Sequence, residues 1–485
     1  MRVVWVRENQ RTVFGCRDCG HESAKWSGFC PSPACGSALP LVEVKPAPKG
    51  VTPARWMVTG RQPVQELSKL DPEDRPLISL PGQEINRVLG GGIVSGSVVL
   101  LTGEPGVGKS TLLLQIAGFL ASQGKSVLYV SGEESPHQVK LRSQRLGIPG
   151  GGIFILPESD VDTILEQLDE CRPALAIVDS IQTLCSEKAS SGPGSVAQVR
   201  ESGLKLMGWA KSSNTPVFVA GHVTKDGGVA GPRVLEHMVD VVTYLEAQDA
   251  GAYRILRNTK NRFGSTSEVG VFEMTGLGLT EVADPSQAML AQRYHGAVGA
   301  AVVPVLEGNR PLMLEVQALT SPSYGPAPRR VGNGVDHNRL LMLSAVASRR
   351  GGLDLAGQDI IVNVAGGFRV SEPAADLPVV MAMASSLLNR ALKNDLAAFG
   401  EVGLSGEVRP APQAQRRVQE AARLGFSHCI LPAANREQVN PPAGMQLVYV
   451  NSVREAVQNA LPERPNNGIN QAPTGLRQES AVAGI

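Results

Sequence analysis

One glycine-rich segment that ends in a lysine and a serine is predicted to bind phosphate groups. Glycines let the chain turn sharply while successive backbone N–H groups point at phosphate oxygens. Lys109 supplies a positive charge to the terminal phosphates, and Ser110 supplies a hydroxyl to Mg²⁺. An apolar strand pattern precedes the segment and a helical pattern follows it, as the motif requires. We therefore predict that ATP and Mg²⁺ bind at Gly103, Glu104, Pro105, Gly106, Val107, Gly108, Lys109, Ser110 and Thr111.

Acidic residues follow two other apolar runs, where they can complete such a site. Asp179 closes the run 175–178 and is expected at the carboxyl end of a strand, the usual place of a Mg²⁺-coordinating carboxylate. Glu133 and Glu134 follow the run 127–130, and Glu133 is the preferred group for positioning the attacking water. Glu134 stays open for this role, and so does a solvated acidic turn without a catalytic role. His222 ends a further run and is a candidate γ-phosphate sensor, with a structural loop histidine as the alternative.

Four of the seven cysteines fall close together near the start of the sequence. Two residues separate Cys16 from Cys19, and four separate Cys30 from Cys35. Two thiolate pairs at such spacing suit a tetrahedral Zn²⁺ site. A short segment with little apolar content also needs a cross-link of this kind to fold. We predict one Zn²⁺ held by these four thiolates; reduced thiols without metal are the alternative.

The elements that position these residues are predicted to form an α/β fold. Short apolar runs alternate with helical patterns, as in a parallel sheet that is buried on both faces. After Asp240, consecutive strand-like segments indicate antiparallel strands that extend the same sheet. The apolar runs are SVVLLTG (97–103), SVLYV (126–130), LAIVDS (175–180) and PVFVAGH (216–222), and the later segments are VVTYLEA, YRILRNTK and EVGVFEM.

Length and composition indicate several domains, because 485 residues exceed what one hydrophobic core usually serves. We predict a C4-type zinc-finger region at 1–43, a linker at 44–75, an ATPase domain at 76–285, a second α/β domain at 286–465 and a disordered tail at 466–485. The net charge of +1 gives no global attraction for nucleic acid, so any DNA contact must come from a local basic surface. No apolar run reaches the ~20 residues that span a bilayer. We expect a cytoplasmic protein without a membrane partner.

Three further motifs accompany the glycine-rich segment and the cysteine cluster. They are Tyr129-Val130-Ser131-Gly132-Glu133-Glu134-Ser135, Gly221-His222-Val223-Thr224-Lys225 and Lys260-Asn261-Arg262-Phe263-Gly264. In this order the motifs resemble those of the bacterial RadA (Sms) family of DNA repair and recombination proteins. The resemblance implies a RecA-like ATPase core that forms homo-hexameric rings on single-stranded and branched DNA. It also implies a recombinase partner and a helicase-type motor that drives branch migration.

The C-terminal domain looks like the proteolytic domain of Lon proteases, which uses a Ser nucleophile and a Lys base. At the matching positions this chain has Ala374 and Gln415, and neither side chain can act as a nucleophile or a base. An ATP-dependent protease of the Lon type is therefore disfavoured, and a scaffold or DNA-binding surface is preferred. An ATP-switched DNA-binding scaffold without translocation uses the same nucleotide residues and stays open.

Several segments are candidates for DNA contact. The arginine pairs 329–330, 349–350 and 416–417 can neutralise phosphates, with solvated charge as the alternative. By resemblance to RecA-like rings, the stretch 186–198 and the loop 225–233 are also expected to contact DNA.

Two cations in the last motif are predicted to act on a neighbouring subunit. Lys260 and Arg262 stand two apart in a strand pattern, so both project to one face. Phe263 is expected on the other face, anchored in the core, and Gly264 permits a turn. By resemblance to RecA-like rings, the target of the cations is the ATP of the neighbouring subunit, whose developing phosphoryl charge they stabilise. The alternative is an exposed basic strand edge that resists aggregation.

Overall fold

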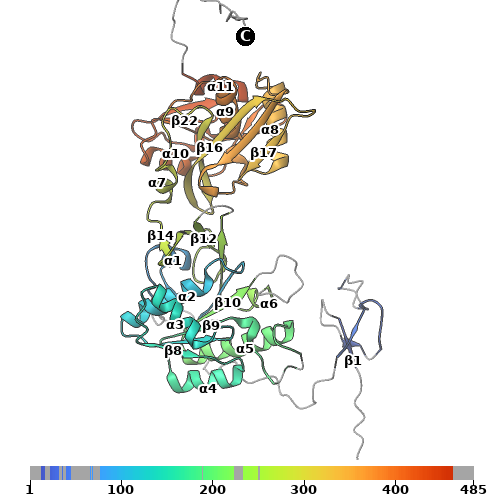
Figure 1. Ribbon diagram of the computed structural model, residues 1–485, viewed down its shortest axis with the longest axis vertical. Coiled ribbons are helices and arrows are strands. Elements are labelled where there is room, and N and C mark those ends of the chain that lie inside the picture. The colour runs from blue at the N-terminus through green and yellow to red at the C-terminus, as the bar shows by residue number, and fades with distance from the viewer. Residues whose placement is uncertain are drawn as a thin grey trace, which may run out of the picture. The chain divides into compact units, whose positions relative to one another are not determined.

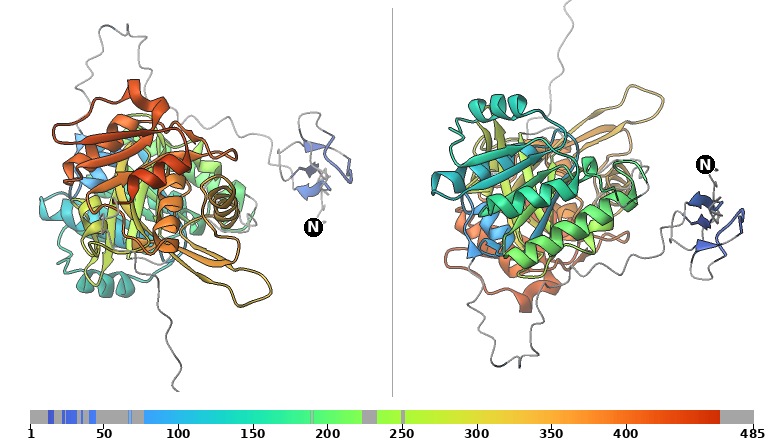
Figure 2. Two further views of the ribbon diagram at one scale, coloured as in Figure 1. Left: turned by 90° about the horizontal axis from the view of Figure 1, so that it is seen from above. Right: turned by 90° about the horizontal axis from the view of Figure 1, so that it is seen from below.

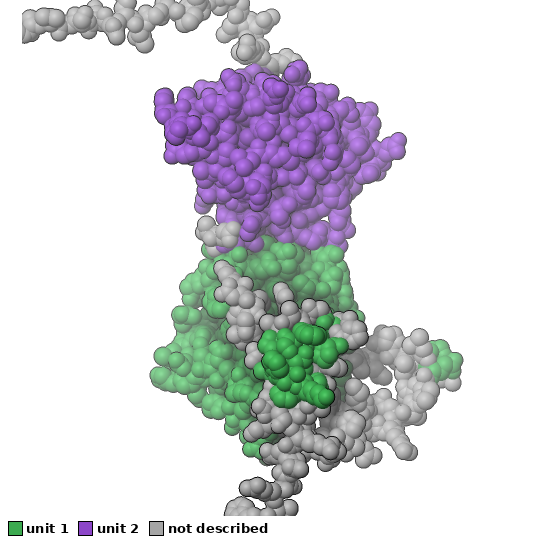
Figure 3. Space-filling model, turned by 90° about the vertical axis from the view of Figure 1, so that its right-hand side faces the viewer, with its two compact units in different colours: residues 1–247, 252–283 green, residues 248–251, 284–485 purple. Residues whose placement is uncertain are grey.

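The computed structural model describes residues 13–16, 22–23, 25–31, 35, 40–44, 66, 68, 77–187, 189, 191–222, 233–248 and 252–462. The chain divides into two compact units, one of Met1–Ala247 with Ala252–Ala283 and the other of Gln248–Gly251 with Asp284–Ile485 (Figure 3). The expected tail and most of the expected linker lie outside the described residues. Within the described ranges, no helix is long and apolar enough to cross a membrane.

A nine-stranded sheet is the centre of the first unit (Figure 1). Its strands are β6 (Val98–Gly103), β7 (Val127–Ser131), β8 (Ile153–Leu156), β9 (Leu175–Asp179), β10 (Val217–His222), β11 (Val241–Ala247), β12 (Tyr253–Asn261), β13 (Val269–Thr275) and β14 (Gly278–Glu281). They lie in the order β14-β13-β12-β11-β6-β10-β9-β7-β8. β6 to β11 pair in parallel, and β11 to β14 pair antiparallel. The prediction that antiparallel strands extend the parallel sheet is confirmed.

Helices cover both faces of this sheet (Figure 2). Successive residues of β6 enter two different apolar clusters: Val99 and Leu101 join the cluster of the first helix after the glycine-rich segment, and Val98 and Leu100 join the other. Strands buried on both faces read as continuous apolar runs, which explains why the sequence revealed them. The helices are α1 (Glu84–Leu89), α2 (Lys109–Ser122), α3 (Pro136–Arg145), α4 (Val161–Cys171), α5 (Val196–Ser213) and α6 (Arg233–Glu236), with the 3₁₀ turn η3 (Ile181–Thr183) and the short pair β4 (Leu77–Ile78) and β5 (Ile93–Val94).

The cysteine-bearing segment forms a small antiparallel sheet of its own. Its strands are β1 (Val13–Gly15), β2 (Glu22–Ser23) and β3 (Val42–Val44), in the order β2-β1-β3. Cys16, Cys30 and Leu41 are the buried residues of its apolar cluster. Among the described residues of this segment, these three are far fewer than a hydrophobic core needs, so a metal cross-link is the expected source of stability.

The second unit contains a seven-stranded mixed sheet. Its strands, in spatial order, are β17 (Arg330–Asn333), β18 (Gln358–Val364), β16 (Arg310–Pro322), β15 (Ala300–Glu307), β19 (Leu396–Ala398), β22 (His428–Pro432) and β23 (Gln446–Val450). A separate hairpin joins β20 (Glu401–Val402) and β21 (Val408–Arg409). The helices are α7 (Pro285–Leu290), α8 (His337–Arg349), α9 (Asp376–Leu387), α10 (Ala414–Arg423) and α11 (Val453–Ala460), with the 3₁₀ turns η4 (Ala365–Gly367), η5 (Pro373–Ala375) and η6 (Ala433–Gln438).

Arg417 does not belong to a DNA-binding surface, contrary to its place among the candidate arginines. Its side chain is fully buried in α10 and forms an ion pair with Glu372. It also donates to the backbone carbonyls of Pro304 and Pro412, at 2.6 and 2.9 Å. A buried guanidinium with these partners stabilises the second unit and is not available to phosphate. The neighbouring Arg416 is exposed, so the pair 416–417 has one surface cation.

We predict that Arg417→Ala strongly destabilises the second unit. Removing one partner of a buried ion pair leaves the other charge uncompensated, which costs about 3–5 kcal/mol. Differential scanning calorimetry of the full chain measures this as a lower transition temperature. The matched control is Arg416→Ala, an exposed change for which we expect less than about 0.5 kcal/mol. Equal melting of the two variants contradicts the assignment.

Candidate functional site

The glycine-rich segment forms a loop between β6 and α2, where a phosphate-binding loop belongs. Gly103 has φ +156° and a Cβ there would lie 2.3 Å from the carbonyl oxygen of Leu245. Gly108, with φ +118°, directly precedes α2 and lies against Met274. Glycine is required at both positions. A residue with a side chain would be strained at these φ angles, and its Cβ would clash with neighbouring atoms. The loop therefore leads straight into the positive N-terminal end of a 14-residue helix.

The Lys109 side chain lies along this loop. Its Nζ donates to the backbone carbonyls of Gly103 and Glu104, at 2.9 and 3.0 Å. Burial lowers the pKa of Lys109, and the carboxylates of Asp179 and Glu133 oppose that shift. The ammonium is thus held at the loop, facing two carboxylates, in the position of a group that binds terminal phosphates.

Asp179 lies at the carboxyl end of β9, next to this ammonium. Its carboxylate is almost buried, and its Oδ2 accepts a 2.6 Å hydrogen bond from the hydroxyl of Tyr129. Burial, and then the proximity of Asp179, raise the pKa of Tyr129 well above its ordinary value. Ser110 and Thr111 are in the first turn of α2. The carboxylate of Asp179 and the hydroxyl of Ser110 are hard oxygen ligands, a donor set that fits Mg²⁺.

Glu133 lies two residues after the end of β7 and contacts two side chains. Ser180 Oγ donates to its Oε1 at 2.5 Å, and His222 Nε2 lies 3.5 Å from the same oxygen. Burial and the charge of Lys109 lower the pKa of His222, and Glu133 and Asp179 oppose this shift. Because β6, β7, β9 and β10 are parallel neighbours, their carboxyl ends place Lys109, Asp179, Glu133 and His222 together.

Glu134 lies outside this cluster of side chains. Its carboxylate forms an ion pair with Arg142 of α3. This ion pair distinguishes Glu134 from the adjacent Glu133. The sequence alone favours Glu133 for positioning the water but leaves Glu134 open. Of the two glutamates, Glu133 is therefore the one that lies with Ser180 and His222.

Lys260 and Arg262 are not brought to the phosphate-binding loop of their own chain. The strand register connects Lys260 through β11 to Leu100 of β6, which is three residues before Gly103. At ~3.3 Å per residue, this places Lys260 about 10 Å from Gly103 along the strand, and Arg262 farther still. The two cations lie at the opposite end of the sheet from their own nucleotide site.

Lys260 lies near the C-terminal end of β12, and Arg262 directly follows that end. Lys260 Nζ donates to the backbone carbonyls of Glu236 and His237, at 2.9 and 3.0 Å. Arg262 Nη1 contacts Asp240 Oδ1 at 3.1 Å, and half of the Arg262 side chain is exposed. Burial and the neighbouring charge of Arg262 lower the pKa of Lys260. The expectation for Phe263 is wrong: its side chain is 40% exposed, because the strand has ended and the chain turns into solvent there.

Described residues of the stretch 186–198 are hydrogen-bonded to one buried side chain, that of Gln198. Gln198 of α5 donates to the carbonyls of Ser186, Ala189 and Ser191 and accepts from the Ser186 N–H, at 2.8 to 3.1 Å. Lys205 donates hydrogen bonds both to Ser186 and to Asp162 of α4. Gln198 therefore holds the described residues Ser186, Ala189 and Ser191 of the loop that follows β9. Of the other candidate DNA loop, 225–233, only Arg233 lies among the described residues.

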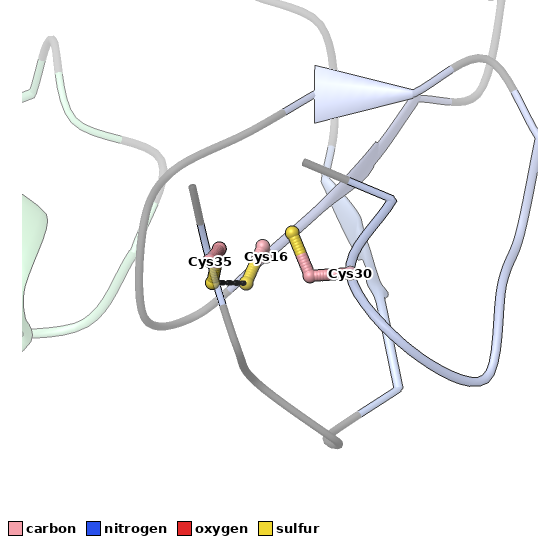
Figure 4. Close-up of side chains that lie close together, drawn as sticks. All are labelled: Cys16, Cys30 and Cys35. Carbon is pink, nitrogen blue, oxygen red and sulfur yellow. Dashed lines mark hydrogen bonds between the residues drawn. The ribbon is translucent and has the colours of Figure 1, made fainter. Parts of the chain in front are cut away.

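Three of the four predicted zinc ligands converge. The Sγ atoms of Cys16, Cys30 and Cys35 all lie within 4.8 Å of one another (Figure 4). Cys16 Sγ is 3.9 Å from Cys35 Sγ, too far for a disulfide and near the ~3.8 Å between thiolates that a tetrahedral ion with ~2.3 Å bonds imposes. These residues fit Zn²⁺, with Cys19 lying outside the described residues.

The protease-like positions carry no catalytic geometry. Ala374 is buried in η5. The side-chain amide of Gln415 both donates to and accepts from the backbone of Asn440. Among the candidate arginines, Arg329 pairs with Asp359, Arg330 donates to backbone carbonyls, and Arg349 and Arg350 are exposed.

Sequence reasoning missed two hydroxyl side chains, Tyr129 and Ser180, that donate hydrogen bonds to Asp179 and Glu133. Tyr129 is two residues before Ser131 on β7, the partner of Asp179 on β9. Ser180 immediately follows Asp179 and is fully buried. A hydroxyl side chain in or directly after an otherwise apolar run was the available signal, but the sequence did not show how β7 and β9 align.

We predict that the finger binds one Zn²⁺ per chain. Elemental analysis of the full chain should give one zinc, and Cys16→Ser should lose it, because thiolates are the ligands. Cys429→Ser is the control, since that buried thiol lies in the second unit. Clearly less than one zinc in carefully prepared wild-type protein contradicts the assignment.

We predict that Glu133→Gln retains ATP but slows hydrolysis by about 10²-fold or more, because the amide cannot accept the proton of the attacking water. Glu134→Gln is the matched control and should hydrolyse ATP near the wild-type rate. Single-turnover hydrolysis and nucleotide binding measure the two effects separately. A slow Glu134→Gln beside a normal Glu133→Gln reverses the assignment.

The chain is similar to known proteins over nearly its whole length. An AAA domain model matches residues 63–228, and a model of subunit ChlI of Mg-chelatase matches residues 335–435. A KaiC-like protein from Pyrococcus horikoshii is 21% identical, with a TM-score of 0.37, over 43% of this chain and 99% of that one. The DNA repair protein RadA of Bacillus subtilis is 45% identical over 93% of this chain and 99% of its own length. That of Escherichia coli is 44% identical over 92% and 98%. Identity of this extent shows that the chain belongs to the RadA family of DNA repair proteins.

Proposed function

We propose that this protein is a DNA-dependent ATPase that acts in DNA repair and homologous recombination. In this proposal it is a ring-shaped, helicase-type motor that promotes branch migration on single-stranded and branched DNA, with a recombinase as its partner. The observation that carries the proposal is the meeting of Lys109, Asp179 and Glu133 at the end of the loop between β6 and α2.

The roles of these residues follow from their charge and position. Lys109 and the backbone N–H groups of the loop bind the phosphates. Ser110 and Asp179 hold Mg²⁺, which neutralises charge on the phosphate oxygens when bound. Glu133, oriented by Ser180, accepts a proton from the attacking water. His222 lies beside Glu133 and senses whether the terminal phosphate is present.

The remaining cations point to assembly. Lys260 and Arg262 lie at the end of the sheet that is remote from their own nucleotide, so they cannot stabilise its hydrolysis. Arg262 is half exposed and can reach another chain. In a ring of identical subunits, Lys260 and Arg262 of one subunit then supply positive charge to the nucleotide that its neighbour binds. Hydrolysis thereby requires assembly, which couples it to movement on DNA.

The DNA contacts of this proposal are the loop after β9 and exposed arginines of the second unit. Gln198 holds the described residues Ser186, Ala189 and Ser191 of this loop, which follows β9 at the same end of the sheet as the nucleotide. Arg349 and Arg350 are exposed cations at the end of α8. A protease role is opposed by the buried Ala374 and by Gln415, which is engaged with the backbone. A scaffold without translocation is separated from a motor by the assay below.

We predict that mixing two inactive variants restores function. Lys109→Ala subunits cannot use their own site, and Arg262→Ala subunits cannot serve a neighbour's, so mixed rings contain some complete sites. We expect Arg262→Ala alone to lower DNA-stimulated hydrolysis by ~10³-fold or more. The measurements are ATP hydrolysis with single-stranded DNA and branch migration of a synthetic four-way junction.

The control is Arg257→Ala, on the same strand but paired with Glu246 at 3.0 Å. It should keep nearly full activity. Full DNA-stimulated turnover by Arg262→Ala alone contradicts the interface role. ATP hydrolysis without any junction movement by the wild-type ring favours the scaffold.

A further inference from the structure

One buried hydroxyl touches the site but has no part in the functions assigned above. Tyr129 is in the middle of β7 and is 1% exposed. Its hydroxyl donates to Asp179 Oδ2 at 2.6 Å, a distance typical of the strong hydrogen bond between a hydroxyl and a carboxylate. The buried hydroxyl therefore holds one specific oxygen of the carboxylate that is proposed to bind Mg²⁺.

The strand register explains how this contact arises. β7 and β9 are parallel neighbours, with Tyr129 opposite Ile177 and Ser131 opposite Asp179. Residues two apart on a strand project to the same face, so Tyr129 and Asp179 share the face that α2 covers. The long tyrosine side chain extends from one strand to the diagonal position on the next. A shorter side chain at this position does not reach the carboxylate.

The surroundings leave the hydroxyl little freedom. The charges of Arg142 and Glu134, which pair with each other, lie near Tyr129 on its own side of the sheet. A carboxylate can rotate about its last bond, and each rotation offers a different oxygen. A hydrogen bond from a fixed donor to Oδ2 removes this choice, since the phenol ring is packed in the core of the sheet.

We propose that Tyr129 is a positioning residue for the metal: it binds Oδ2 of Asp179 and so presents Oδ1 to the Mg²⁺ that Asp179 and Ser110 hold with ATP. The inference rests on the proposed ATPase function and adds a residue to it. Partners of this kind fix the orientation of a metal-binding carboxylate before the metal arrives. The competing explanation is structural, in which Asp179 merely satisfies a buried tyrosine hydroxyl.

The two explanations predict a different Mg²⁺ dependence of nucleotide binding when the Tyr129 hydroxyl is removed. Tyr129→Phe removes one oxygen atom and keeps the shape of the core. If Tyr129 positions the metal, this variant needs about 10-fold more Mg²⁺ for half-maximal binding of a fluorescent ATP analogue, as when other outer partners of metal ligands are removed. Binding of the same analogue in EDTA should be unchanged, because the phosphate-binding loop is intact. A structural role lowers the melting temperature and leaves the Mg²⁺ titration where it was.

Tyr244→Phe is the matched control. Its hydroxyl donates to Glu236 at the same 2.6 Å, and its ring packs on the other face of the same sheet. This variant should lose about as much stability as Tyr129→Phe but titrate with Mg²⁺ like the wild type. A second control is Asp179→Asn, in which Tyr129→Phe should add no further Mg²⁺ requirement, because Tyr129 acts through Asp179.

The outcomes separate this inference from the proposed function. A Tyr129→Phe titration that overlays the wild type overturns the inference, and so does a Tyr129→Phe chain that does not fold or a further shift in the Asp179→Asn background. In these cases the wild type still binds and hydrolyses Mg²⁺–ATP, so the ATPase proposal stands. Failure of the wild type to bind the analogue in a Mg²⁺-dependent way counts against the ATPase proposal instead.

Discussion

The parallel arrangement of four strands is the constraint on which the site depends. Because β6, β7, β9 and β10 run in the same direction, every chain segment that leaves them emerges at one edge of the sheet. The phosphate-binding loop, Glu133, Asp179 and His222 are distant in sequence and meet only there. Burial of these strands on both faces fixes their register through packing, because successive side chains must each fit the apolar cluster on their own face. The hydrophobic core thus determines the distances between charged groups that it does not itself contain.

The same constraint decides how much of the molecule was predictable. The parallel strands were evident because double-sided burial leaves continuous apolar runs, and their ends gave Asp179 and Glu133. The pairing of the strands was not evident, because a run such as SVLYV contains no information on which strand lies next to it in the sheet. Tyr129 and Ser180 were missed for this reason. Phe263 was misplaced because its strand ends at Asn261, two residues before it, and strand ends are set by tertiary contacts that a local pattern does not contain.

The second unit shows the opposite limit. Arg416 and Arg417 are adjacent and chemically identical, yet one is exposed and the other is fully buried with an acidic partner 45 residues away. Charge alone placed both on the surface, because a buried arginine is uncommon unless it is paired. The helical position of Arg417, on the inward face of α10 beside Val418, was the information that charge could not supply.

The antiparallel strands also have a mechanical consequence for the phosphate-binding loop. Arg254, at the start of β12, donates from Nε to the carbonyl oxygen of Val107 at 3.2 Å, and Met274 and Leu279 of the next two strands lie against Gly108. The loop therefore rests on the same strand whose far end carries Lys260 and Arg262. Rigid secondary-structure elements such as a strand within a sheet can carry coupling between two sites. In a ring of the proposed kind, β12 would connect the phosphate-binding loop of its own subunit, through Arg254, with the cations that act on the neighbour's nucleotide. Within that proposal, β12 is a structural connection through which hydrolysis at one nucleotide site influences the next site in the ring.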